Sequence, residues 1–349
     1  MQTPALDLQN KSTAPIVESK NSAIETLRAA AVLLVFAHHM HSASIFSIPF
    51  IGETGGWIGI QIFFVISGYL IVKSAARYSA LDYVRHRALR IYPAYILWFL
   101  VFSVWFGNLK PGSIDVKSLV IHLLFLQHLF PEAYFKYNAL RVSWTLTVEM
   151  IWYVTAFLFV AVIHSRPSKT LALVVLAACF WVYGGHHLLP FYKTLDAGNS
   201  YFFVNNHTIA QLPFFFMGAW ISVKQPKFDN AALFGIFVGT IILSPAWLGS
   251  FPSPIFMTGL GVASLFLLLQ NIQYHNPRPV RILSDISYSF YLIHYPIIFI
   301  TSQSVHNKFH QVLVSLVATI VVAYASYRLV EQPFIGLARK RKQVEQATV

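Results

Sequence analysis

Runs of about twenty apolar residues recur along this chain, from near residue 24 to near residue 330. A helix of about 20 apolar residues crosses the roughly 30 Å hydrocarbon core of a bilayer, and it satisfies its own backbone hydrogen bonds there. The 349 residues are 56% hydrophobic and only 11% charged, whereas a soluble domain carries about 25% charged residues. The sequence therefore predicts an all-α, polytopic membrane helix bundle.

Ten runs are long enough to be predicted membrane spans. They lie at 24–42, 56–73, 91–107, 144–163, 170–184, 206–222, 230–248, 255–271, 282–302 and 311–330. The stretch 119–130 is too short to cross comfortably, and loop charge decides against it. Ten spans place 19 of the 25 Lys and Arg residues on the cytoplasmic side, whereas eleven spans divide them 12 to 13. Because cytoplasmic loops are enriched in Lys and Arg, we expect about ten transmembrane helices with both termini in the cytoplasm.

No internal repeat or linker divides the chain, so one transmembrane domain is expected over residues 21–337. Residues 1–20 lack the apolar core of a signal peptide and are expected to form a flexible cytoplasmic tail. Residues 338–349 are expected to form a basic cytoplasmic tail, and 108–142 an extracytoplasmic loop with a short interfacial helix. The spacing of Gly55 and Gly59 predicts a close approach of two helices.

The net charge of +12 raises the question of nucleic acid binding. The basic residues fall in short loops between apolar runs and form no continuous face, so nucleic acid is not an expected partner, whereas membrane lipids are. His306 and His310 have a metal-like spacing, but nothing beside them supplies a third ligand, so no metal site is expected. The absence of a Walker loop argues against an ATP-driven pump of that kind.

Arg28 and His39 are polar residues within the first predicted span. They are eleven residues apart, close to three helical turns, so both side chains lie on nearly one face, about 16 Å apart along the axis. Such a polar stripe is unfavourable in hydrocarbon. It indicates a face that lines a cavity used for chemistry or transport.

Glu149 lies five residues inside the outer end of the fourth predicted span, at a depth similar to that of His39. Two interpretations are open. Glu149 could hold a ring nitrogen of His39, which would fix the tautomer and leave the other nitrogen as a base. Alternatively, each side chain forms hydrogen bonds to neighbouring helices separately.

A basic cluster lies between the second and third predicted spans, and a tyrosine stripe lies in the ninth. The cluster suits either lipid headgroups or the capture of an anionic substrate, because the forked donors of arginine match phosphates. The stripe suits packing more often than binding. The cluster consists of Lys73, Arg77, Arg85, Arg87 and Arg90, and the stripe of Tyr288, Tyr291 and Tyr295.

Six segments, taken in order, resemble the acyltransferase family 3 of integral membrane acyltransferases. They are 27–39 (LRAAAVLLVFAHH), 56–71 (GWIGIQIFFVISGYLI), 87–93 (RALRIYP), 143–149 (SWTLTVE), 286–294 (ISYSFYLIH) and 331–333 (EQP). Each segment alone is a weak signal, whereas the ordered set is highly specific and extends over residues 21 to 337. The resemblance implies a ten-helix bundle that moves an acyl group, often acetyl or succinyl, from cytoplasmic acyl-CoA to a hydroxyl of a carbohydrate or lipid-linked glycan.

The resemblance also implies roles for particular residues. His39 matches the essential histidine, Arg28 the essential arginine, and Glu149 the motif glutamate. Arg87 and Arg90 match the cytoplasmic arginine motif. Many members have an acid where this chain has Gln61, whose amide can form hydrogen bonds but cannot act as a base. The basic C-terminus resembles the stand-alone form of the family.

The sequence thus predicts an O-acyltransferase of a bacterial cytoplasmic membrane, with acyl-CoA as co-substrate and no permanently bound cofactor. His39 would be the base that Glu149 orients, and Arg28, Arg87 and Arg90 would hold the acyl-CoA phosphates. Further candidates for substrate binding are Gln61, Ser67, Tyr288 and His294. The alternative is a secondary transporter or flippase for an anionic or lipid-linked solute, although the chain lacks the obvious two-halves symmetry that transporters often have.

Overall fold

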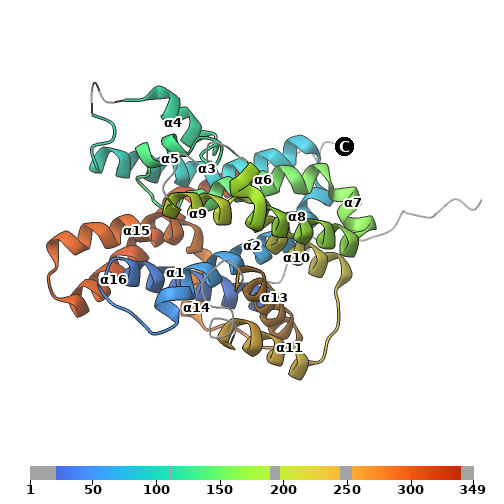
Figure 1. Cartoon of the computed structure of the whole chain (residues 1–349). Coiled ribbons are helices and arrows are strands. Elements are labelled where there is room, and N and C mark those ends of the chain that lie inside the picture. The colour runs from blue at the N-terminus through green and yellow to red at the C-terminus, as the bar shows by residue number, and fades with distance from the viewer. Residues whose placement is uncertain (1–20, 111, 113, 189–196, 244–253, 339–349) are drawn as a thin grey trace, which may run out of the picture.

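The computed structural model describes residues 21–110, 112, 114–188, 197–243 and 254–338. Within these residues the chain is helical and contains no strand. Both predicted tails, 1–20 and 338–349, lie outside the described residues apart from residue 338. The helices gather into one bundle, and α4 and α5 stand at one edge of it beyond α3 (Figure 1).

Within the described residues the ten predicted runs fall on helices, and the end of the run 230–248, residues 244–248, lies outside them. The elements are α1 (Ser22–Ser42), α2 (Ile51–Arg77), α3 (Ala80–Trp105), α4 (Val116–Leu123), α5 (Pro131–Lys136), α6 (Trp144–Leu158), α7 (Val160–Ser165), α8 (Pro167–Leu188), α9 (Ala197–Asn206), α10 (Thr208–Lys224), α11 (Asn230–Phe237), η2 (Val238–Leu243), α13 (Pro254–Asn271), α14 (Arg278–Asp285), α15 (Ser287–Ser304), α16 (Lys308–Ser326) and η3 (Tyr327–Glu331). The predicted all-α class is therefore confirmed for the described residues.

Among the residues that the structure describes, four helices are long and apolar enough to cross a membrane. They are Ser22–Ser42, Ile51–Arg77, Ala80–Trp105 and Lys308–Ala338, and shorter apolar helices run over Trp144–Leu158, Pro167–Val182, Asn230–Ile241 and Met257–Asn271. Several apolar helices thus make this a multi-pass architecture. The count of about ten spans and the cytoplasmic placement of both termini stay predictions.

Helix α2 is the centre of the bundle, and glycines bring its neighbours close. A Cβ atom on Gly55 would lie 2.8 Å from the backbone oxygen of Leu34, and one on Gly59 would lie 2.7 Å from that of Ala31, both on α1. On the other side, a Cβ atom on Gly218 of α10 would collide with the backbone oxygen of Val65. The close approach predicted from the glycine spacing is therefore confirmed, and it fixes α1 and α10 against α2.

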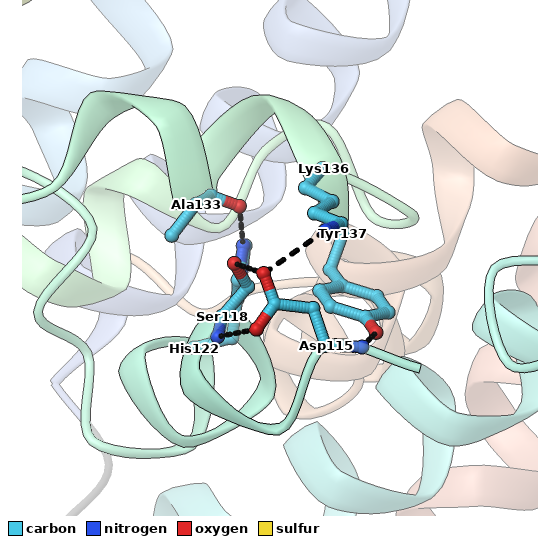
Figure 2. A network of polar contacts seen from close by, with 6 residues as sticks. All are labelled: Asp115, Ser118, His122, Ala133, Lys136 and Tyr137. Atoms are coloured by element: carbon cyan, nitrogen blue, oxygen red, sulfur yellow. Dashed lines mark hydrogen bonds and ion pairs between the residues drawn. The ribbon is translucent and has the colours of Figure 1, made fainter. Parts of the chain in front are cut away.

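Residues 108–142, which we call the cap, differ from the expected loop with one short helix. They contain two helices, α4 and α5, joined by polar contacts (Figure 2). The Asp115 carboxylate accepts hydrogen bonds from the Ser118 hydroxyl at 2.8 Å and from Lys136 Nζ at 3.0 Å. The backbone N–H of Asp115 donates to the Tyr137 hydroxyl at 2.5 Å. Because helices this short are unstable alone, these contacts hold the cap together.

His122 anchors the cap to the bundle. Its Nε2 donates to the backbone oxygen of Ala133 at 2.9 Å, and its Nδ1 lies 3.3 Å from Gln127 Nε2. Gln127 Oε1 in turn accepts from the Thr147 hydroxyl of α6 at 2.6 Å. A ring that donates at Nε2 and accepts at Nδ1 is neutral. Burial agrees with this, because it lowers the pKa of His122 to about 4.

We expect Gly218→Ala to lower the melting temperature of the detergent-solubilised protein strongly, because the added methyl group meets the α2 backbone. Overpacking of this kind typically costs about 1–3 kcal/mol. The matched control is Gly235→Ala on α11, where an added Cβ meets nothing within 4 Å. The control should melt no earlier than the parent, since alanine favours a helix by about 1 kcal/mol over glycine. Equal melting of all three proteins would contradict this view of the α2–α10 contact.

We expect the cap to open more readily as the pH falls from 7 to 5. Burial lowers the pKa of His122 to about 4 and that of His128 to about 3, whereas an unfolded histidine titrates near 6.5. Below about pH 6.5 these histidines therefore bind protons in the opened cap but not in the closed cap. The equilibrium constant for closing the cap then falls about tenfold per pH unit for each such histidine. Hydrogen exchange of cap amides, corrected for the intrinsic exchange rate, measures this opening.

Asp115→Asn is the control for that measurement. Hydrogen bonds from Lys136 and Ser118 lower the pKa of Asp115 to about 2, so its contribution is complete above about pH 4 and is lost only below it. The variant should reduce protection by the same factor at pH 7 and pH 5. Protection that is independent of pH in the parent protein would show that the buried histidines do not hold the cap closed.

Candidate functional site

A cavity of about 360 Å³ opens among α1, α2, α3, α6 and α15. Its wall includes Arg28, Lys73, Arg77, Arg87 and Arg90, and Glu149 supplies a carboxylate. We call this space the basic cavity. Five cationic side chains around one carboxylate leave an excess of positive charge, which favours a ligand with several negative charges.

Glu149 of α6 is held by two hydroxyl groups in the wall of the basic cavity. Ser67 Oγ of α2 donates to Glu149 Oε1 at 3.2 Å, and the Tyr153 hydroxyl, one turn along α6, donates to the same oxygen at 2.6 Å. The Tyr83 hydroxyl of α3 donates to the backbone oxygen of Tyr153 at 2.8 Å. These bonds connect α2, α3 and α6 at one point.

Arg87 of α3 points from the same side of the cavity towards α2. Its Nη2 donates to the Ser74 hydroxyl at 3.1 Å, and its guanidinium carbon lies 5.6 Å from the ring centre of Tyr153. Tyr288 of α15 also lines the cavity, and its hydroxyl donates to the backbone oxygen of Ile91 of α3 at 2.9 Å. The cation is thus positioned by helices on both sides, with donors left for a ligand.

His39 lies in a different environment, near the end of α1. Its Nδ1 is 2.9 Å from Nε2 of His294 on α15 and 3.0 Å from the backbone oxygen of Val35. The ring of Tyr295 meets His39 edge to face, with centres 4.8 Å apart. The neighbouring His38 instead directs its Nδ1 to the backbone oxygen of Gly52 at 2.8 Å. We call His39 and His294 the histidine pair.

Tyr291 separates the basic cavity from the histidine pair. Its side chain lines the cavity, and its ring centre lies 5.7 Å from that of His294. The hydroxyl donates to the backbone oxygen of Val142 at 3.1 Å and lies 2.9 Å from the Thr145 hydroxyl. These contacts fix the ring in the wall of the cavity, next to His294.

The structure therefore brings together part of the predicted site. The basic cavity contains six of the predicted residues, which are Arg28, Ser67, Arg87, Arg90, Glu149 and Tyr288. His39 and His294 lie beyond Tyr291 and are not in the cavity wall as described, and Gln61 is buried on α2, also outside that wall.

Two expectations about His39 change. The hydrogen bonds of Glu149 go to Ser67 and Tyr153, and His39 contacts His294, so the interpretation in which Glu149 holds His39 is wrong and the separate-partner interpretation is right. The stripe from Arg28 to His39 is also divided, because only its Arg28 end lines the cavity. Sequence reasoning missed Tyr291 as the divider, although it noted the tyrosine stripe to which this residue belongs.

Most of the chain is similar to known proteins. The sequence model of one family, described as an acyltransferase domain, matches residues 21–328. Peptidoglycan O-acetyltransferase OatA of Listeria monocytogenes is 25% identical, over 89% of this chain and 55% of that protein. The O-acetyl transferase of Shigella phage Sf6 is 26% identical, over 90% of this chain and 96% of that protein. Nodulation protein 10 of Rhizobium leguminosarum bv. viciae is 27% identical, over 80% of this chain and 82% of that protein.

The chain thus spans about half the length of the Listeria relative and nearly all of the phage relative. No solved structure matches it. The family match extends over most of the sequence and includes every residue of the basic cavity wall named above and both members of the histidine pair. The chain belongs to the acyltransferase family 3, whose members are integral membrane acyltransferases.

Proposed function

We propose that this protein is a membrane O-acyltransferase of a bacterial cytoplasmic membrane. It moves an acyl group, acetyl or succinyl, from cytoplasmic acyl-CoA to a hydroxyl of a carbohydrate or lipid-linked glycan. The observation that carries this proposal is the basic cavity, in which five Lys and Arg side chains converge beside the fixed Tyr291 wall. The printed names of the Listeria and phage relatives, both O-acetyl transferases, support the reaction class.

The cavity suits the two chemical parts of an acyl-CoA. Arg87, Arg90 and Arg28 can share its phosphates, because guanidinium groups offer paired donors that match phosphate oxygens. Another part of the wall is apolar and aromatic, with Phe63 and Phe64 of α2. There the ring of Phe63 meets that of Tyr291, with centres 6.1 Å apart, and this part suits the uncharged pantetheine arm. The thioester would then stand at the Tyr291 end, next to the histidine pair.

His39 is the base in this proposal. Its Nε2 takes the proton of the acceptor hydroxyl as that oxygen attacks the thioester carbonyl carbon. The carbon–sulfur bond breaks, and the departing CoA thiolate receives the proton from His39, so the products are an ester and free CoA thiol. Tyr291 must turn aside for the thioester to reach His39. A positioned base contributes about 10²–10⁴ to a rate, and a transient acyl-histidine would give the same overall balance.

Glu149 has a different role from the one first expected. It is the carboxylate of the basic cavity wall, and its bonds to Ser67 and Tyr153 fix two side chains beside the arginines. A negative charge here reduces the repulsion among the cations. We therefore assign Glu149 to the shaping of the acyl-CoA site.

We expect His39→Ala to lower the rate of acyl transfer by a factor of about 10²–10⁴, because the base is removed. The variant should stay folded and inserted in the membrane. Purified protein in detergent, given radiolabelled acyl-CoA and a crude glycan acceptor, provides the assay without any membrane gradient. The KM for acyl-CoA should change little. Full activity of the variant would remove His39 as the base, and solute movement across vesicles without any acylation would instead favour a transporter.

We expect Arg90→Ala to raise the KM for acyl-CoA about tenfold or more, because a hydrogen bond to a charged group contributes about 1.5–3 kcal/mol. Arg85 is the matched control, since it lies in the same basic segment of α3 but outside the cavity wall. Arg85→Ala should leave the KM within about twofold of the parent. Equal effects of the two substitutions would indicate general electrostatic attraction and not a phosphate site in the basic cavity.

A further inference from the structure

We propose that His294 is the positioning residue of His39, and that it fixes both the tautomer and the orientation of the catalytic ring. This inference rests on the proposed function, in which His39 is the base. It assigns to α15 the orienting role that one interpretation of the sequence gave to Glu149.

The tautomer of His294 follows from its contacts within α15. Its Nδ1 lies 2.7 Å from the backbone oxygen of Tyr291 and 3.3 Å from that of Phe290. Carbonyl oxygens only accept hydrogen bonds, so Nδ1 must carry the hydrogen. In the neutral ring, the lone pair is then on Nε2, which is the nitrogen that faces His39.

The tautomer of His39 follows from that of His294. The Nδ1 of His39 is 2.9 Å from Nε2 of His294, which carries the lone pair, and 3.0 Å from the Val35 backbone oxygen. Both partners are acceptors, so the Nδ1 of His39 is the donor and its own lone pair is on Nε2. That Nε2 makes none of the hydrogen bonds found among the described residues, and it is therefore available to an acceptor hydroxyl.

The packing of His294 makes it a rigid support. The side chain is 1% exposed, and its ring is stacked on that of Phe290, with centres 6.2 Å apart and planes 17° apart. Phe290 in turn meets Phe36 of α1 edge to face, with centres 6.0 Å apart. The ring of His294 therefore cannot turn without disturbing the α1–α15 contact.

The same arrangement explains why this neighbour is a histidine and not a carboxylate. A neutral imidazole accepts a hydrogen bond from His39 at one nitrogen and donates one to a backbone carbonyl from the other, so no charge is buried. When His39 accepts a proton at Nε2, its Nδ1–H still donates to His294. A charged His294 would place two N–H groups against each other, so the pair works only while His294 is neutral.

The first test reads the tautomers without any assay of activity. Full-length protein labelled with ¹⁵N-histidine is studied by NMR in lipid nanodiscs at pH 7.5, and the His39 signals are assigned by their loss in His39→Gln. We expect wild-type His39 to be protonated at Nδ1 and unprotonated at Nε2. A dominant Nε2–H form in the wild type would overturn the proposal, and this measurement requires no variant of His294.

The second test compares His294→Ala with His294→Gln. Alanine removes the acceptor, so the His39 signals should show mixed tautomers, and kcat should fall about tenfold to a hundredfold with an unchanged KM for acyl-CoA. That loss is smaller than the rate enhancement of about 10²–10⁴ that a positioned base supplies, because misplacing the base removes only part of its contribution. Glutamine can return an oxygen acceptor close to the Nε2 position, so it should restore most of kcat, whereas a merely structural role for His294 would show no such split.

Unchanged tautomer and kcat in His294→Ala, alongside an inactive His39→Ala, would contradict the positioning role and leave the proposed function intact. A fully active His39→Ala would contradict the proposed function instead. In that case the tautomer measurement would still decide whether His294 orients the His39 ring.

Discussion

The free-energy cost of burying ionisable side chains in an apolar bundle determines how the candidate site is built. Placing Arg28, Glu149 and His39 among apolar helices is unfavourable unless other polar groups or a ligand satisfy them. Two of these three groups have hydrogen-bond partners in the protein, and they find them in two separate places. Glu149 is satisfied by hydroxyl groups from α2 and α6 within a cluster of cations, and His39 is satisfied by His294 from α15. Tyr291 lines the basic cavity and also contacts His294, so it stands between the two groups.

The sequence predicted the helical elements well, because they follow from helical periodicity and the length of each apolar run. The membrane depth of the polar residues stays a prediction. The sequence placed Arg28, Arg87 and Arg90 in one ligand site, and they do line one cavity, which Glu149 lines as well although it was predicted to orient His39. It could not predict which side chains meet, because the position of a residue along a helix does not determine how that helix is rotated about its own axis. Helix α2 packs against both α1 and α6, and Glu149 accordingly bonds to Ser67 of α2 rather than reaching His39 on α1.

The contact within the histidine pair and the structure of the cap could not be predicted from the sequence either. His39 and His294 are 255 residues apart, so only the packing of α1 against α15 reveals that they touch. The cap helices are too short to be stable alone, and their position depends on bonds such as those of Asp115 and His122 (Figure 2). Local sequence patterns therefore identified one short helix where tertiary contacts create two.

In the proposed reaction one acyl-CoA extends from the basic cavity past Tyr291 to His39. A cryo-EM structure of the protein with a non-hydrolysable acyl-CoA analogue would show where that molecule lies. We expect phosphates against Arg87 and Arg90, the Tyr291 ring turned aside, and the acyl carbonyl carbon beside His39 Nε2. An analogue whose acyl group stops on the cavity side of an unmoved Tyr291, or whose phosphates bind elsewhere, would contradict it.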